Sequence, residues 1–102
     1  MPERSRLKRV YEDDKMIVIR DVAPAAPVHV LMIPKAHTEN IITAEPELIL
    51  YMFGKVKELA EKLGVNEKGF RIVANTGDDG GQTVKHLHIH LLGGKALGWP
   101  PC

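Results

Sequence analysis

The sequence predicts an α+β domain in which an antiparallel five-stranded sheet is covered by one main helix. Three observations support this fold class. The 102 residues fit a single domain, 1–102. Short runs rich in β-branched residues, separated by turn residues, occupy the first third and the last third of the chain. Between them lies one long segment with apolar residues at helical spacing, so strands and helix are grouped rather than alternating.

The first three strands are expected at residues 10–11, 16–20 and 28–33. Turn-forming residues follow the first strand, and a loop with two prolines separates the second from the third. Connections this short favour neighbouring antiparallel strands, so the three strands are predicted to form a meander. Residues 1–9, which are polar and basic, are expected to be a flexible N-terminus.

The helix is predicted over residues 45–63. Pro46 suits its first turn, and Gly64 supplies a stop. The apolar residues of this segment recur at spacings of three and four and form one stripe, which is expected to pack against the sheet. They are Leu48, Met52, Val56, Leu59 and Leu63.

Two further strands are expected at residues 69–74 and 83–92, joined by a glycine-rich loop and followed by a C-terminal tail over 93–102. Alternation along the second of them places His86, His88 and His90 on one face. Leu87, Ile89 and Leu91 then lie on the other face, against the helix. The histidine face is left to solvent, to a ligand or to another chain.

Composition excludes several function classes. Fourteen basic and thirteen acidic residues leave a net charge of +1, which argues against a general nucleic-acid or anionic-membrane binder. No apolar run reaches the length of a membrane span, and the polar start is unlike a secretory signal, so a cytoplasmic protein is expected. The one cysteine, Cys102, excludes an internal disulfide and a multi-cysteine zinc site.

Three histidines in five positions indicate chemistry, because other polar residues would serve solubility more simply. A metal site is one hypothesis, with two histidines of the strand and His29 or His37 as a further ligand. However, His86 and His90 would lie about 13 Å apart along a strand, too far to share an ion. Neutral imidazole acting as a nucleophile fits the spacing better, so catalysis is preferred and metal binding is the second reading.

The loop before the histidines is glycine-rich, which by itself indicates a plain β-turn, but its place directly before the histidine strand favours an anionic substrate. Its three glycines allow backbone N–H groups to converge on a phosphate, and they are Gly77, Gly80 and Gly81. Gln82 and Thr83 add side-chain donors beside the histidine face. Asp78 and Asp79 would repel a phosphate, so both are expected to face solvent.

The segment His86-Leu87-His88-Ile89-His90-Leu91-Leu92 resembles the motif of the histidine triad family, His-φ-His-φ-His-φ-φ with φ apolar. The resemblance extends from about Val10 to the C-terminus. The ending Leu92 to Pro101, with its Gly-Gly and Trp-Pro-Pro, is similar to the Hint branch of nucleoside phosphoramidases. Residues 82–86 also resemble the Fhit branch of dinucleoside polyphosphate hydrolases, and the tail favours Hint.

The resemblance implies hydrolysis of nucleoside 5′-monophosphate phosphoramidates, with purine nucleosides preferred and AMP or GMP as product. His88 would attack the α-phosphorus and form a nucleotidyl-histidine. His90, Gln82 and Thr83 would hold the phosphate oxygens. The remaining two histidines would complete the cluster by orienting His88 and relaying protons, and they are His29 and His86.

The resemblance also implies a nucleoside pocket and a partner chain. Asp21 would accept the ribose hydroxyls, and Ile19 and Val22 would line the base pocket. The backbone of Gly81 would contact the nucleotide, with Asn75 on the leaving-group side. A homodimer with a continuous sheet is expected, with Trp99 reaching the partner's site, and no metal, cofactor, nucleic acid or membrane.

Departures from the family pattern leave alternatives open. The chain starts short and lacks the N-terminal cysteines of many members, Thr83 stands where Hint proteins often carry serine, and Cys102 replaces the usual terminal glycine. A Fhit-like dinucleoside polyphosphate hydrolase and a nucleotide-binding regulatory module therefore remain alternative functions.

Overall fold

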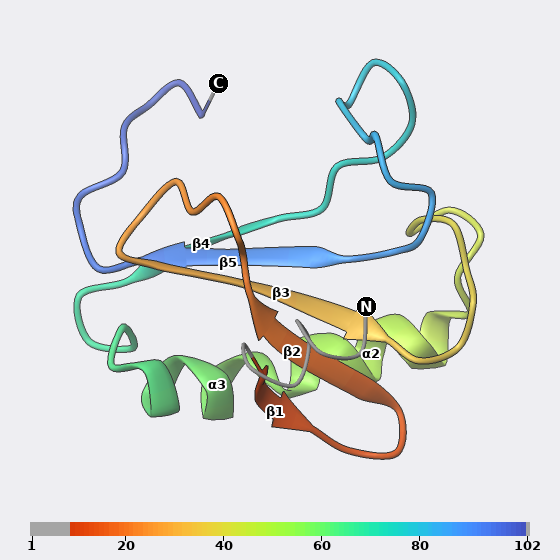
Figure 1. Ribbon diagram of the computed structural model, residues 1–102, viewed down its shortest axis with the longest axis horizontal. Helices are drawn as coiled ribbons and strands as arrows, with labels where there is room; N and C mark the ends of the chain where they lie inside the picture. The colour runs from red at the N-terminus through yellow and green to blue at the C-terminus, as the bar shows by residue number, and fades with distance from the viewer. Residues whose placement is uncertain (1–8, 102) are drawn as a thin grey trace.

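The computed structural model describes residues 9–101 and has the predicted α+β architecture. Its five strands form one antiparallel sheet in the order β1-β2-β3-β5-β4. The strands are β1 (Arg9–Glu12), β2 (Met16–Arg20), β3 (Val28–Pro34), β4 (Phe70–Val73) and β5 (Ile89–Gly93). Two helices, α2 (Pro46–Gly54) and α3 (Val56–Leu63), run along one face, while residues 75–88 and the tail rise from the other side (Figure 1). Among the described residues no helix is long and apolar enough to cross a membrane.

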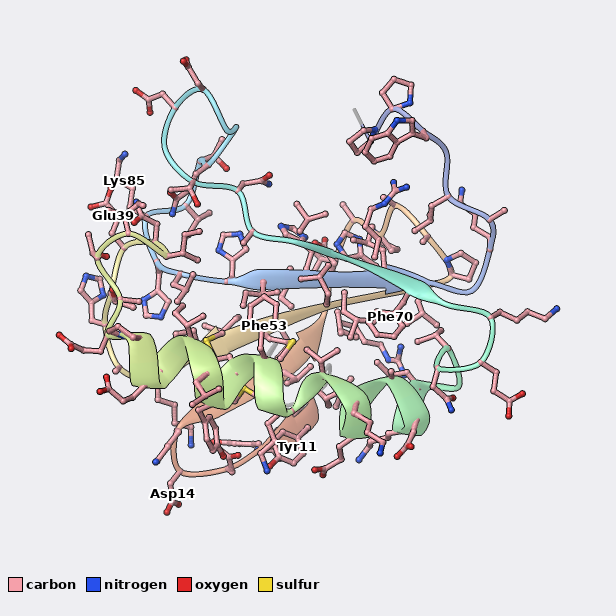
Figure 2. The ribbon with its side chains drawn as sticks, turned by 180° about the vertical axis from the view of Figure 1, so that it is seen from behind. Tyr11, Asp14, Glu39, Phe53, Phe70 and Lys85 are labelled. Atoms are coloured by element: carbon pink, nitrogen blue, oxygen red, sulfur yellow. The ribbon has the colours of Figure 1, made fainter. Side chains whose placement is uncertain are left out.

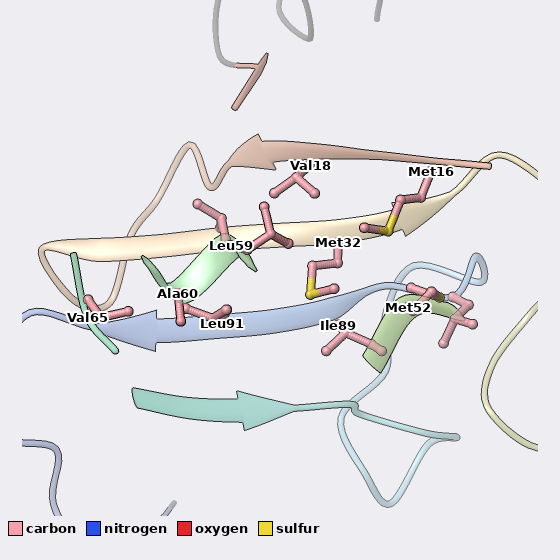
Figure 3. Close-up of a cluster of buried hydrophobic side chains, with 11 residues drawn as sticks. Met16, Val18, Met32, Met52, Leu59, Ala60, Val65, Ile89 and Leu91 are labelled. Carbon is pink, nitrogen blue, oxygen red and sulfur yellow. The ribbon is translucent and has the colours of Figure 1, made fainter. Parts of the chain in front are cut away.

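The hydrophobic core lies between the sheet and the two helices (Figure 3). Alternate residues of the three central strands are buried toward the helices: Met16 and Val18 of β2, Val30 and Met32 of β3, Ile89 and Leu91 of β5. The predicted helix stripe meets them, with Met52 and Leu59 fully buried and the other three members packed around them. With this face covered, the opposite face of the sheet is left for other contacts.

The predicted single helix is two helices separated at Lys55. Gly54 ends the first, and a glycine within a helix is unfavourable. The backbone N–H of Lys55 donates to the carbonyl of Met52, three residues back, which tightens the chain at the junction. The Lys55 ammonium lies over the rings of Tyr11 and Tyr51, 5.6 and 5.4 Å from their centroids. The apolar stripe continues across the break.

The predicted strand over residues 83–92 is shorter, because β5 begins at Ile89. Residues 83–88 are not paired in the sheet and contact the end of β3 and the loop after it: the N–H of Leu87 donates to the carbonyl of Thr38 at 2.7 Å. The alternation of faces nevertheless persists into this segment. Leu87 is buried with Ile89 and Leu91, and the three histidines of the motif are half-buried on the other side.

Gly93 is the last residue of β5, so the tail begins one residue later than predicted. A Cβ atom at this position would lie 2.9 Å from Cγ1 of the buried Val65, which follows α3. The strand can therefore approach the end of the helix layer only without a side chain here.

Candidate active site

Histidines from two adjacent strands and the segment before β5 gather on the face of the sheet opposite the helices. His29 comes from β3, and His90 from β5, whose partner in the register is Leu31. The ring centroids of His29 and His90 are 5.2 Å apart, as are those of His88 and His90. Three members of the predicted cluster, His29, His88 and His90, are thus brought together. His86 and His88 precede β5, and the ring of His86 contacts His37 instead.

His29 is held in one protonation form by the backbone. The N–H of Ala25 donates to its Nδ1 at 3.0 Å, so this nitrogen is an acceptor and the hydrogen of the ring lies on Nε2. That Nε2–H points to Nδ1 of His90 at 2.9 Å, with an oxygen of the Asp21 carboxylate 3.4 Å away. The ring is buried, with 7% of its side chain exposed. His29 therefore positions His90 through this hydrogen bond, while its Nδ1 is occupied by the N–H of Ala25.

The same reasoning fixes His90. Its Nδ1 accepts from His29, so its hydrogen lies on Nε2. No buried side-chain nitrogen or oxygen of the described residues lacks a hydrogen-bond partner, so this Nε2–H is accessible to solvent or a ligand. Burial and the neighbouring His88 and His29 lower the pKa of His90 below its ordinary 6.5, against the opposing charge of Asp21. His90 is consequently a neutral ring that offers one donor at neutral pH.

His88 has the opposite arrangement. Its Nδ1 donates to the carbonyl of His86 at 2.8 Å, and a carbonyl only accepts. In the neutral ring the hydrogen is therefore on Nδ1, and Nε2 carries a lone pair that no described group uses. A neutral imidazole whose Nδ1–H is held by a backbone carbonyl and whose Nε2 is bare is the arrangement expected of a nucleophile.

His86 is fixed by two further contacts. Its Nε2 donates to the carbonyl of Pro34 at 2.9 Å, and its Nδ1 lies 3.3 Å from Nδ1 of His37. His37, which the sequence left without a role beyond a loop position or a further metal ligand, thus contacts the first histidine of the motif.

One group of side chains has the composition of a metal site. Asp21, His29 and His90 bring their potential ligand atoms within 4.8 Å of one another. However, a neutral histidine that binds a metal through Nε2 carries its hydrogen on Nδ1. In His29 the Nδ1 atom already accepts the N–H of Ala25, so a metal on Nε2 would bring the hydrogen on Nδ1 into contact with the hydrogen of Ala25. The three side chains therefore suit a hydrogen-bonded cluster better than a metal site.

The glycine-rich loop is closed on itself by Gln82. The buried Gln82 side chain accepts the N–H of Gly77 at 2.9 Å and donates to the carbonyls of Glu39 and Val84 at 2.7 and 3.0 Å. Both amide hydrogens are therefore used, and the expected donation from Gln82 to a phosphate would require breaking them. Figure 2 shows Glu39 beside Lys85, at the place where this contact joins the two loops.

The backbone of the same loop also differs from the predicted phosphate cradle. The N–H of Gly81 donates to the carbonyl of Asp78 and that of Gln82 to Gly77, both at 3.0 Å, because the chain turns tightly here. The turn needs glycine at position 80, where a Cβ would lie 2.5 Å from the carbonyl oxygen of Thr76. The N–H groups of Gly77, Gly81 and Gln82 thus stabilise the loop rather than point outward.

The remaining predicted residues of this region lie where an incoming ligand can reach them. Thr83 is exposed beside Gln82, and Asn75 is half-buried just after β4. Asp78 and Asp79 are exposed, as predicted. Thr83 is therefore the side-chain hydroxyl available at the end of the loop next to the histidines.

The residues predicted to bind the nucleoside lie at the other end of the cluster. Asp21 follows β2 and is linked to His29 through its backbone N–H, which donates to the His29 carbonyl at 3.0 Å. Ile19 is half-buried on β2 opposite Leu31, on the same face as the histidines, and Val22 is 56% exposed. An apolar surface next to an acceptor carboxylate is thus present.

The tail carries Trp99 away from the rest of the chain. Arg71 of β4 donates to the carbonyl of Gly98 at 2.7 Å and anchors the tail to the sheet. Trp99 itself is 82% exposed, so it does not fill an apolar edge of its own chain.

Known proteins resemble this chain in sequence. The sequence profile of the HIT domain matches residues 4–97. The chain belongs to the histidine triad (HIT) family. An uncharacterised HIT-like protein of Synechococcus elongatus is 55% identical over 95 residues, which make up 90% of this chain and 82% of that protein.

Solved structures place the chain in the same family. The crystal structure of a HIT family hydrolase from Legionella pneumophila superposes with a TM-score of 0.89 at 41% identity, covering 93% of this chain and 88% of that one. A histidine triad nucleotide-binding protein from Candida albicans superposes with a TM-score of 0.77 at 29% identity, over 90% and 73% of the two chains.

Sequence reasoning missed the groups that orient the histidines of this HIT protein. The N–H of Ala25 and the carbonyls of Pro34 and His86 are backbone groups, which no residue pattern reveals. His37 had no signal beyond its loop position three residues after Pro34, the last residue of β3.

Proposed function

We propose that this HIT protein hydrolyses nucleoside 5′-monophosphate phosphoramidates through a covalent intermediate on His88. The observation that carries the proposal is the hydrogen bond from Nδ1 of His88 to the carbonyl of His86, which leaves Nε2 as the attacking atom. The hydrolase name of the Legionella structure and the nucleotide-binding name of the Candida protein are consistent with it.

The reaction has two balanced steps. Nε2 of His88 attacks the α-phosphorus, the P–Nε2 bond forms, and the P–N bond to the substrate amine breaks. The amine leaves after taking a proton from solvent. Water then attacks the same phosphorus and gives up one proton to solvent, the P–Nε2 bond breaks with its electron pair returning to Nε2, and a 5′-mononucleotide is released from the neutral His88. The positive charge that His88 carries while nucleotidylated is stabilised by the carbonyl of His86.

The other residues have supporting roles in the proposal. His90 donates from Nε2 to a phosphate oxygen, and Thr83 donates its hydroxyl from the opposite side. His29 holds His90 in the tautomer with its hydrogen on Nε2. Because Nδ1 of His29 is occupied by the N–H of Ala25, His29 relays no proton. Gln82 supports Thr83 by fixing the loop, instead of binding phosphate itself.

At the nucleoside end, Oδ1 of Asp21 accepts the N–H of Ala23 at 2.8 Å, and the remaining lone pairs of the carboxylate suit the two ribose hydroxyls. The apolar Ile19 and Val22 suit a flat purine base. A nucleotide substrate is consistent with a cytoplasmic protein. Asn75 and the tail of a second chain would lie near the departing amine, with Trp99 as the reaching residue.

A homodimer is part of the proposal. β4 is an edge strand, so the unpaired groups on its outer side can continue the sheet into a second copy. Large apolar side chains are exposed on the neighbouring elements and the tail: Leu50 and Phe53 on α2, Phe70 on β4, and Trp99. Sedimentation equilibrium tests this: a stable monomer at micromolar concentration would refute the dimer.

The central experiment uses His88→Asn. The amide nitrogen of asparagine occupies nearly the place of Nδ1 and can still donate to His86, but the attacking Nε2 is gone. Turnover of an adenosine phosphoramidate is expected to be abolished while AMP binding and the melting temperature stay close to wild type. Retained turnover would refute the mechanism.

Two outcomes with the wild-type protein would favour the alternatives. Cleavage of diadenosine triphosphate but not of the P–N substrate would indicate a Fhit-like hydrolase. Binding of AMP without cleavage of either substrate would indicate a regulatory module.

A further inference from the structure

The segment that carries the nucleophile, residues 86–88, has no ladder pairing in the sheet. The β3–β5 pairing starts with Met32 opposite Ile89, so His86 and His88 lie before the first ladder pair. Three contacts of residues 86–88 tether the segment instead, and all of them reach residues 34–38. Two use backbone acceptors, the carbonyls of Thr38 and Pro34, at 2.7 and 2.9 Å. The third is provided by one side chain, His37.

The chemistry of His86 fixes the direction of this third contact. Because Pro34 offers a carbonyl, Nε2 of His86 carries the hydrogen, and Nδ1 of the neutral ring is an acceptor. His37 must then donate from its own Nδ1 across the 3.3 Å separation. The two rings lie at 58° with centroids 5.2 Å apart, so the contact is a hydrogen bond rather than a stack.

His86 thus connects His37 to the nucleophile. Both of its ring nitrogens are bound, one by Pro34 and one by His37, and its carbonyl accepts the Nδ1–H of His88 at 2.8 Å. Rotation of the His86 ring would loosen the residue whose carbonyl selects the attacking nitrogen. His37 is exposed and contributes nothing to the buried core, so core packing does not explain this contact.

We propose that His37 is a positioning residue for the reaction: by donating to His86 it fixes the carbonyl that orients His88. This inference rests on the proposed function. Since His37 lies at the end of the cluster away from Asp21, it acts on the nucleotidylation rate and not on nucleoside binding.

Three substitutions at this position separate the donor from mere bulk. His37→Ala removes the donor, His37→Asn keeps a donor nitrogen where Nδ1 stood, and His37→Asp offers only an acceptor. Loss of one neutral hydrogen bond predicts a kcat about 3- to 10-fold lower in His37→Ala with KM within about 2-fold. His37→Asn is expected to recover kcat to within about 2-fold of wild type. Lys85→Ala, an exposed neighbour whose ion pair with Glu39 spans 3.9 Å, is the matched control and should equal wild type.

A spectroscopic readout is independent of turnover. Two-bond ¹H–¹⁵N correlations of the imidazole rings are expected to show His86 with hydrogen on Nε2 alone in the wild type and in His37→Asn. In His37→Asp the same ring should carry hydrogen on both nitrogens near neutral pH, because the carboxylate accepts from Nδ1 while Pro34 still accepts from Nε2.

The outcomes are distinguishable. Equal kcat in wild type, His37→Ala and His37→Asn would overturn the role of His37 while leaving the His88 mechanism intact. Equally slow alanine and asparagine variants, or an unchanged His86 spectrum in His37→Asp, would also overturn it. A wild-type protein that forms no nucleotidyl adduct would refute the proposed function instead, with the spectra still reporting on the contact.

Discussion

Replacing Gln82 with methionine should destabilise the fold strongly, although no charge and little volume are changed. The side chain is buried, 7% exposed, and makes three hydrogen bonds, all to backbone groups. At about 1 kcal/mol net for each bond, Gln82→Met is expected to lose about 3 kcal/mol of the free energy of unfolding. For a domain of this size that corresponds to a fall of about 10 to 20 °C in melting temperature.

Thermal unfolding followed by circular dichroism measures this change. Thr83→Ala is the neighbouring control, since the residue is exposed and its loss should shift the free energy of unfolding by no more than about 0.5 kcal/mol. Gln82→Glu keeps the acceptor for Gly77 but sets a carboxylate against two carbonyls, so it should be at least as unstable as the methionine variant. A melting temperature of Gln82→Met within about 2 °C of wild type would refute the view that Gln82 joins the two loops.

Three further predictions concern packing and titration. Gly93→Ala should lower the free energy of unfolding, measured by chemical denaturation, by about 1–3 kcal/mol. Gly98→Ala, where a Cβ meets nothing within 4 Å, should lower it little. Equal losses in the two variants would contradict the close approach of Gly93 to Val65. Burial alone would raise the pKa of Asp13, but hydrogen bonds, the largest from Tyr51, outweigh it and hold this pKa well below its usual range. The stability that Asp13 contributes is therefore present above the unfolded pKa, about 3.9, and is lost as the pH falls below it. Tyr51→Phe should make the melting temperature fall less steeply with decreasing pH in this acid range. An unchanged acid dependence would exclude this contact. Burial and the neighbouring His88 and His29 lower the pKa of His90, so its ring should titrate below pH 6.5 when followed by NMR. The free energy of unfolding should then rise with pH between this lowered pKa and 6.5. A titration midpoint at or above 6.5 would contradict the prediction.

The sheet and its covered face were predictable because burial imposes a strict period on the residues. The stripe around Met52 and Leu59 and the alternation around Ile89 have one arrangement that buries them all, and the structure has it. The element ends were less predictable. The break at Lys55 and the late start of β5 depend on contacts between segments distant in sequence, such as the bond from Leu87 to Thr38.

The same division applies to the site. That His29, His88 and His90 gather on one face follows from strand alternation and from the pairing of β3 with β5. Strand alternation does not predict which nitrogen of each ring is free, because backbone groups of Ala25 and His86 determine it. The glycine-rich loop had a plausible interpretation as a phosphate cradle, but a short tight turn uses its own N–H groups first.

The central claim is that Nε2 of His88 becomes covalently bonded to phosphorus. Rapid-quench mass spectrometry of the wild-type protein mixed with an adenosine phosphoramidate tests it most directly. Within the first turnover one adenylyl group should appear on the peptide that contains residues 86–92, localised by fragmentation to His88, and it should disappear as AMP forms. An adduct localised to His86 or His90, or full turnover with no adduct at any quench time, would contradict the account.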